Sequence, residues 1–273
     1  MRCAVVIPAR YGSTRFPGKP LADVAGRSLI GRVHDLAAAA KGVDRVVVAT
    51  DDERIADHVR AFGGEAVMTP ASCRNGTERV HAAAVELGER PDAVINLQGD
   101  AVLTPPWVIE AIVDEMQRSP DAPIVTPAAR LDAGSLALLR EAKAAGEVGG
   151  TTVVFDVNGD ALYFSKAVLP YERDPEGGAP TFRHVGLYGY RYDALERFVA
   201  LPSSPLERTE GLEQLRALEN GVRIRVVEVD YRGRRHLAID SPDDLVRVER
   251  ILAEDGELVA PPTGSERAHG SDA

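Results

Sequence analysis

The sequence predicts an α/β fold, in which a mostly parallel sheet carries helices on both faces and an antiparallel insertion. Continuous β-branched and apolar runs such as residues 45–50 are typical of parallel strands that are buried on both faces. Segments with helical periodicity alternate with these runs through the first half, as they do in βαβ units. After about residue 130, short strands are separated by polar turns such as Asn158-Gly159-Asp160, which favours antiparallel pairing.

Each element of the first half is assigned from its local pattern. Apolar runs predict strands at 3–7, 45–50, 65–68, 93–97 and 124–128. A helix is expected after Asp51 and Asp52, which stand at the N-cap position, and it ends at Gly63 and Gly64. Two more helices are expected at 77–87 and at 107–117, and Pro105 and Pro106 open the second of them.

The second half continues with shorter elements. Strands are expected at 151–157, 161–165, 184–190 and 222–229, and helices at 206–219 and 241–254. We expect one domain over residues 1–255, within which about 131–200 form an antiparallel subdomain. Residues 256–273 are small, polar and rich in proline, which predicts a disordered tail.

The composition excludes several classes of function. The chain has 273 residues, a formal net charge of −10 and 44% hydrophobic residues, which indicates a soluble protein with a substantial core. The acidic balance argues against nucleic acid as a partner. There is no apolar run near the roughly 20 residues of a membrane span, and no signal for secretion. Two cysteines are too few for a disulfide framework, so a cytoplasmic location is expected.

The segment from Ile7 to Pro20 is the strongest functional signal. It follows the first predicted strand, contains small and hydroxyl residues, and carries the cations Arg10, Arg15 and Lys19 with no acidic residue between them. Such a loop is suited to bind a polyphosphate. It is not a Walker loop, because its glycines are one residue too far apart and a proline follows the lysine. The dinucleotide pattern G-x-G-x-x-G is also absent.

Residues 10–21 resemble the N-terminal signature of the CMP-KDO synthetases, the 3-deoxy-manno-octulosonate (KDO) cytidylyltransferases. The resemblance covers about residues 2–250 and includes, in family order, the motifs at 48–51, 75–79, 96–100, 161–165, 183–191 and 212–216. It implies a Rossmann-like, glycosyltransferase-A-like nucleotidyltransferase sheet. It also implies transfer of CMP from CTP to a small acidic acceptor with release of pyrophosphate, a Mg²⁺ cofactor, and a homodimer formed through the antiparallel region.

The resemblance also implies the residues of the nucleotide and metal sites. The expected catalytic residues are Arg10, Arg15, Lys19 and Asp100. The expected nucleotide-binding residues are Pro8, Ala9, Arg10, Gly12, Ser13, Thr14, Arg15, Lys19, Arg74, Asn75, Gly76 and Gln98. Asp100 and Asp240 each end a strand-like run, and Mg²⁺ prefers carboxylate and phosphate oxygens. The alternatives are that Asp240 belongs to an ordinary turn before Ser241, and that Asn75 and Gly76 form a tight turn with Thr77 as the cap.

For the acceptor, the matched positions are Gln98, Lys166, His184, Tyr188, Glu213 and Gln214. Lys166 is expected to pair with the acceptor carboxylate, and His184 and Tyr188 to lie on the same side of one strand. Three segments depart from the family pattern, namely Ala101-Val102, Thr152 and residues 235–239, which replace a glycine-rich approach to Asp240. Lys166 also replaces the more usual arginine.

The resemblance implies KDO as the acceptor. The departures leave two alternatives open, another 3-deoxy-ulosonic acid or a carboxylated phosphonate such as phosphonoformate. A related nucleotidyltransferase that uses UTP is a further alternative. So is a non-catalytic nucleotide-binding homologue.

Overall fold

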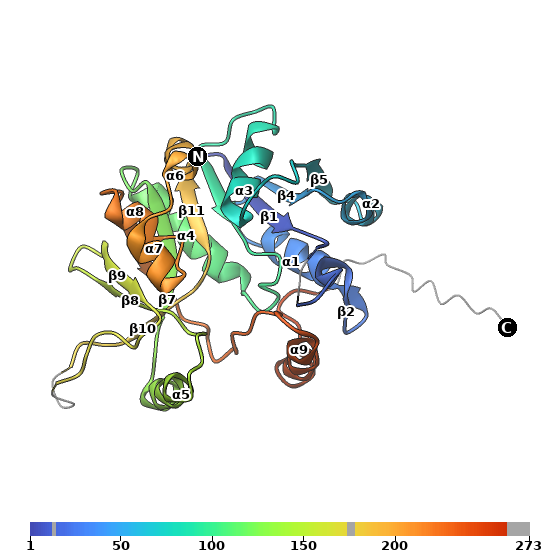
Figure 1. Ribbon diagram of the computed structural model, residues 1–273. Helices are drawn as coiled ribbons and strands as arrows, with labels where there is room; N and C mark the ends of the chain where they lie inside the picture. The colour runs from blue at the N-terminus through green and yellow to red at the C-terminus, as the bar shows by residue number, and fades with distance from the viewer. Residues whose placement is uncertain (13–14, 174–177, 261–273) are drawn as a thin grey trace.

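The computed structural model describes residues 1–12, 15–173 and 178–260. Within these residues a ten-stranded sheet has the order β5-β4-β1-β6-β11-β7-β10-β8-β9, and β12 pairs with β7. Figure 1 shows the N-terminal strands at one side of the molecule and β8 to β10 at the other. The strands are β1 Cys3–Ala9, β4 Arg45–Thr50, β5 Glu65–Met68, β6 Ala93–Asn96, β7 Ile124–Arg130, β8 Thr152–Phe155, β9 Ala161–Ser165, β10 Phe182–His184, β11 Tyr188–Arg191 and β12 Ile224–Glu228, with a separate small hairpin of β2 Asp23–Val24 and β3 Arg27–Ser28.

The pairing confirms the predicted α/β class. β1 pairs in parallel with β4 and β6, β4 with β5, and β7 with β12. β11 is antiparallel to both β6 and β7, so it lies between two parallel strands. β10 is antiparallel to β7 and β8, and β8 to β9. The antiparallel strands thus continue the same sheet, although the division into one domain with a subdomain stays a prediction.

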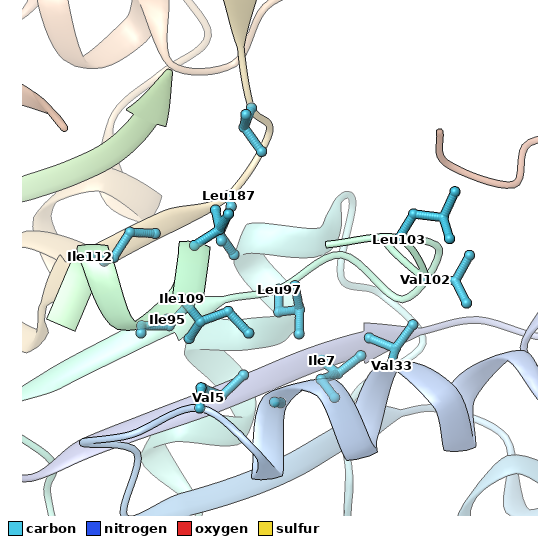
Figure 2. Close-up of a cluster of buried hydrophobic side chains, with 14 of the residues drawn as sticks. Val5, Ile7, Val33, Ile95, Leu97, Val102, Leu103, Ile109, Ile112 and Leu187 are labelled. Carbon is cyan, nitrogen blue, oxygen red and sulfur yellow. The ribbon is translucent and has the colours of Figure 1, made fainter. Parts of the chain in front are cut away.

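Helices cover both faces of the sheet because the buried strands are apolar on both sides. They are α1 Leu29–Ala38, α2 Glu53–Ala61, α3 Gly76–Val85, α4 Pro106–Arg118, α5 Ala133–Ala144, α6 Tyr192–Ala200, α7 Pro205–Glu210, α8 Leu215–Glu219 and α9 Pro242–Asp255, with the 3₁₀ turn η1 Lys19–Leu21. Val5 and Ile7 belong to a cluster with α1, α4 and α9, whereas Val6 belongs to a cluster with α3, α6 and α8. Figure 2 shows Val5 and Ile7 near residues of α1 and α4.

The predicted strand at 184–190 is wrong in one respect, because the structure divides it into β10 and β11. His184 pairs with Ala128 and Gly189 with Val125, so the intervening segment has two more residues than the facing part of β7. The bulge lies where the second neighbouring strand changes, because β10 pairs with β8 on its other side and β11 pairs with β6. Residue patterns on one strand do not show such a change of neighbour.

The predicted helix at 206–219 is also divided. Gly211 has a φ of +64°, a left-handed conformation that ends α7, and α8 begins only at Leu215. The short link between them carries Glu213 and Gln214, two predicted acceptor residues. The residue patterns also did not predict α5 or α6. In α5, the N-cap Asp132 accepts a hydrogen bond from the backbone N–H of Ser135 at 2.7 Å.

The segment after α9 is attached to the rest of the fold through Glu257. α9 ends at Asp255, and Glu257 then accepts hydrogen bonds of 2.8 and 3.0 Å from the guanidinium of Arg32, which is only 4% exposed. A buried guanidinium needs such a carboxylate partner, which places Glu257 within the fold although it belongs to the predicted tail. Residues 261–273 of that tail lie outside the described residues. In the part of the chain that is described, no helix is long and apolar enough to cross a membrane.

Candidate active site

Three segments meet at the carboxyl edge of the parallel strands, where α/β sheets usually place their ligands. The loop after β1 leads into η1, which carries Lys19. The turn after β6 carries Asp100, and the residues before α9 carry Asp240. A backbone hydrogen bond of 3.3 Å from Ile239 N to Asp100 O joins the second and third segments directly.

Lys19 lies between the two aspartates. Its Nζ donates to Asp100 Oδ2 at 2.7 Å and to the carbonyl of Ile239 at 2.8 Å, and it is 3.8 Å from Asp240 Oδ1. Arg15 Nη2 lies 3.4 Å from the same oxygen of Asp240. The structure therefore brings two cations of the first loop to the two predicted metal ligands, although these residues are up to 225 positions apart in the chain.

The two carboxylates suit a magnesium ion that is shared with a nucleotide. Both approach one cation, the ammonium of Lys19, so they are directed at a common point. Among the described residues no group of three or more His, Cys, Asp or Glu side chains could hold a metal by itself. Mg²⁺ is commonly bound through one or two carboxylates together with substrate phosphates, and two aspartates fit that pattern.

Glycines allow the segments to approach one another closely. A Cβ on Gly99 would lie 2.8 Å from the carbonyl oxygen of Pro8, a distance that real Cβ atoms essentially never show. A Cβ on Gly76 would lie 3.4 Å from Pro8 Cγ and 3.5 Å from Gln98 Oε1. The start of α3 thus packs beside the end of β1 and the turn after β6.

The remaining predicted nucleotide residues lie in two groups. Arg10 donates through Nη2 to the carbonyl of Cys73, which ties the first loop to the segment before α3. Arg74 is 75% exposed and pairs with Glu78, with 2.6 Å between Nε and Oε1. Ala9 is buried at the end of β1, whereas Gly12 has open space at its Cβ position. Ser13 and Thr14 lie outside the described residues.

Asn75 is the N-cap of α3, the role that the alternative interpretation gave to Thr77. Its Oδ1 accepts from Glu78 N at 2.8 Å, and its Nδ2 donates to Glu213 Oε1 at 2.8 Å. Glu213 was expected beside the acceptor, so the structure brings a predicted nucleotide residue and a predicted acceptor residue into direct contact. Burial raises the pKa of Glu213 above its ordinary value.

Two residues of this network were not predicted as site residues, namely Thr77 and Asn96. Thr77 Oγ1 lies 2.6 Å from Glu213 Oε2, and Asn96 Nδ2 donates to Thr77 Oγ1 at 3.3 Å. Gln98 Nε2 in turn donates to Asn96 Oδ1 at 3.0 Å. The available signal was an asparagine inside the apolar run 93–97, since a buried amide requires hydrogen-bond partners.

In the aromatic part of the predicted acceptor site, His184 is buried and Tyr188 is half-buried. The rings of His184 and Tyr188 lie 5.4 Å apart despite the bulge between them, and Phe164 lies 4.9 Å from His184. Thr126 Oγ1 is 2.8 Å from the carbonyl of Leu187 and 2.9 Å from His184 Nε2. Because a hydroxyl has one proton and the carbonyl only accepts, we assign the proton of that second contact to Nε2 of the imidazole. Burial also raises the pKa of Tyr188.

Lys166 and Gln214 complete the predicted acceptor set. Lys166 Nζ lies 3.3 Å from Thr151 Oγ1, and its backbone N–H donates to Glu210 Oε2 at 2.8 Å. Gln214 is 6% exposed, and its Nε2 has no hydrogen-bond partner among the described residues. A buried amide without a partner is costly, which marks Gln214 as a donor available to a ligand.

The burial of His184 should make the stability of the protein depend on pH. Burial lowers its pKa to about 3, and the charge of Lys166 adds to this effect. Below pH 6.5 the unfolded chain therefore binds a proton that the folded chain does not, so stability is complete above pH 6.5 and is lost as the pH falls towards 3. We expect His184→Gln to reduce the pH slope of the unfolding free energy between pH 6 and 4.5 by about 1.4 kcal/mol per pH unit. Urea titrations of both proteins measure it, and equal slopes would contradict a neutral buried imidazole.

A mixed α/β sheet, with a cationic loop and two convergent aspartates at the carboxyl edge of its parallel strands, is the arrangement of a nucleotidyltransferase. The cytidylyltransferase family model matches residues 4–224. The chain belongs to this family.

Individual relatives agree with this assignment. The chain is 58% identical over 259 residues to 3-deoxy-manno-octulosonate cytidylyltransferase of Maricaulis maris, a match that covers 95% of this chain and 100% of the relative. It is 50% identical to the enzyme of the same name from Anaeromyxobacter dehalogenans, over 92% of this chain and 97% of the relative. A solved structure of CMP:2-keto-3-deoxy-manno-octonic acid synthetase complexed with CTP matches with a TM-score of 0.83 and 38% identity, over 93% of this chain and 100% of that one.

Proposed function

We propose that this cytidylyltransferase transfers CMP from CTP to KDO, giving CMP-KDO and pyrophosphate, with Mg²⁺ as cofactor. The observation that carries the proposal is the convergence of Lys19, Asp100 and Asp240 at the end of the parallel strands. High identity to enzymes that are named for KDO, over nearly the whole chain, supports this acceptor.

In the proposed nucleotide site, the triphosphate lies against the loop after β1. Arg10, Arg15 and Lys19 supply positive charge, and the backbone N–H groups that follow Pro8, from Ala9 to Gly12, together with Ser13 and Thr14, supply further donors. The proposed contacts to the cytidine are Arg74, Asn75 and Gly76 at the start of α3 and Gln98 in the turn after β6. The contact between Arg10 and the carbonyl of Cys73 supports this arrangement, because it joins the two groups.

In the proposed reaction, a hydroxyl oxygen of the acceptor attacks the α-phosphorus of CTP. A new phosphorus–oxygen bond forms, the bond to pyrophosphate breaks, and the hydroxyl proton is released. Arg15 and Lys19 stabilise charge on the α-phosphate and on the leaving pyrophosphate. Asp100 and Asp240 would hold Mg²⁺, which supplies charge neutralisation at the phosphate oxygens when it is bound.

The proposed acceptor site combines one cation with several hydrogen-bonding groups. Lys166 pairs with the carboxylate, and the other contacts come from Gln98, His184, Tyr188, Glu213 and Gln214. His184 acts as a neutral group, since burial keeps its pKa near 3. Thr152, one of the departures from the family pattern, is buried and donates to the carbonyl of Ala167 at 2.7 Å, so its hydroxyl supports the segment that follows Lys166.

We also propose a cytoplasmic homodimer. None of the residues of α5 is buried, and Leu138 on this helix is 69% exposed, which suits a surface covered by a second copy. The antiparallel region that includes α5 is the expected contact. Light scattering that gave a single-chain mass of 29.3 kDa would contradict the dimer.

The proposed activity is tested by pyrophosphate release with each of the four nucleoside triphosphates, with Mg²⁺ and a panel of acceptors. The panel contains KDO, other 3-deoxy-ulosonic acids and phosphonoformate, and mass spectrometry identifies the CMP adduct. We expect release with CTP and KDO, and at least tenfold less with UTP or with the other acceptors. Preference for UTP would overturn the nucleotide assignment, preference for another acid would overturn KDO, and CTP binding without release would favour a non-catalytic homologue.

A further inference from the structure

The carboxylate of Glu213 joins two parts of the chain that the proposed function assigns to different substrates. Glu213 belongs to the link between α7 and α8, on the acceptor side. Its Oε1 accepts from Asn75 Nδ2 at 2.8 Å, and its Oε2 lies 2.6 Å from Thr77 Oγ1, so its two oxygens are bound by the N-cap and by the first turn of α3. A shift of Glu213 would therefore disturb the start of α3 as well.

The direction of the hydrogen bonds around Thr77 follows from the number of protons. An ionised carboxylate only accepts, so the single hydroxyl proton of Thr77 is donated to Glu213. The oxygen of Thr77 then accepts from Asn96 Nδ2 at 3.3 Å, and Asn96 Oδ1 accepts from Gln98 Nε2 at 3.0 Å. Thr77 is 3% exposed and Asn96 1%, so solvent does not compete for these bonds.

We propose that Thr77 is a positioning residue, which orients the Glu213 carboxylate for the acceptor and links it through Asn96 to Gln98. The inference rests on the proposed function, because Gln98 and Glu213 are acceptor residues only there. Thr77 itself touches neither substrate in this proposal. Its effect arises because a carboxylate held on both oxygens loses its fixed orientation when one of the two donors is removed.

The hydroxyl of Thr77 helps to keep the Glu213 carboxyl ionised among the charges that surround it. Burial raises the pKa of Glu213, the hydrogen bond from Thr77 and the charge of Arg216 lower it, and Glu207 and Glu78 raise it. Tyr188 and Tyr190 also lie near enough to interact with this carboxylate. Arg216 is shared, because its Nη2 is 2.6 Å from Glu207 and 3.5 Å from Glu213. Loss of the Thr77 donor would therefore raise the pKa of Glu213 further.

The first test compares Thr77→Val, which removes the hydroxyl, with Thr77→Ser, which keeps it. We expect Thr77→Val to raise the KM for the acceptor about tenfold, with a smaller change in the KM for CTP. On the acidic side of the pH profile, the fall in kcat/KM should shift to higher pH by about one unit, because Glu213 would ionise at a higher pH. Thr77→Ser should restore both values to within about twofold of the unmodified protein. The unmodified protein in the same assay reports on the proposed function separately.

The second test needs no activity. When the pKa of a carboxyl group is higher in the folded chain than in the unfolded chain, the folded chain is destabilised as the pH rises from the unfolded-state pKa through the folded-state pKa. Thr77→Val should therefore unfold at a lower urea concentration than Thr77→Ser, and the difference between their midpoints should increase from pH 5 to pH 7.5. A constant gap would show that the lost hydroxyl does not act on Glu213, and would overturn the inference. An unchanged acceptor KM in Thr77→Val, or equal losses in both variants, would overturn it as well.

Discussion

Replacement of Asp100 by asparagine is expected to lower the rate of pyrophosphate release by about 10²–10³-fold, the loss typical of one charge-stabilising group. Asp100 is the carboxylate nearest to Lys19, at 2.7 Å, and it faces the point that Asp240 also approaches. The amide keeps the size of the side chain but removes the negative charge that would bind Mg²⁺. Steady-state assays over a range of Mg²⁺ concentrations measure the effect, and the requirement for Mg²⁺ should rise.

The matched control for this variant is Asp57→Asn. Asp57 is 72% exposed on α2, and its ion pair with Arg60 should contribute little to stability. The control should keep full activity, and both variants should unfold at nearly the same urea concentration as the unmodified protein. Near-normal turnover of Asp100→Asn at low Mg²⁺ would contradict the assignment of this carboxylate to the metal.

Gly99→Ala is expected to reduce turnover by about 10²-fold, because a displacement of about 1 Å in an active site has effects of this size. The added Cβ would lie 2.8 Å from the carbonyl oxygen of Pro8, and a backbone atom cannot rotate away as a flexible side chain can. The end of β1, which leads into the loop with Arg10 and Arg15, must then separate from the turn that carries Asp100. The unfolding free energy should fall by about 1–3 kcal/mol.

Gly149→Ala is the matched control for this second variant. Its Cβ would meet no atom within 4 Å, and Gly149 does not have a positive φ, so the same methyl group should cost little there. Turnover and urea unfolding of the two variants separate a local effect at the site from a general effect of alanine. If Gly99→Ala retained full turnover, the close approach of these two segments would not matter for catalysis.

The sequence predicted the strands of the parallel half well, because each of them is a continuous apolar run. Chain order gives the neighbours of β1, β4 and β5, whereas β6 returns to the other side of β1. The sequence predicted less of the second half. The bulge between β10 and β11 depends on which strands lie on either side, namely β8 and β6, and those strands are distant in the chain. The break at Gly211 was missed because a helical pattern continues on both sides of it.

The candidate site shows the same division. Arg15, Lys19, Asp100 and Asp240 were predicted from local motifs, and the structure brings them together. Thr77 and Asn96 were missed because their importance arises only from contacts with Glu213 and Gln98 in the folded chain. Glu213 was predicted from the family motif alone, and its contacts with the start of α3 could not be read from either segment separately.

A crystal structure of the chain with CTP and Mg²⁺ would show where the nucleotide and the metal bind, since CTP does not turn over without an acceptor. We expect the triphosphate to lie against Arg10, Arg15 and Lys19, with the metal bound by Asp100, Asp240 and phosphate oxygens. A nucleotide bound away from the loop after β1, or a metal bound by neither aspartate, would contradict this expectation.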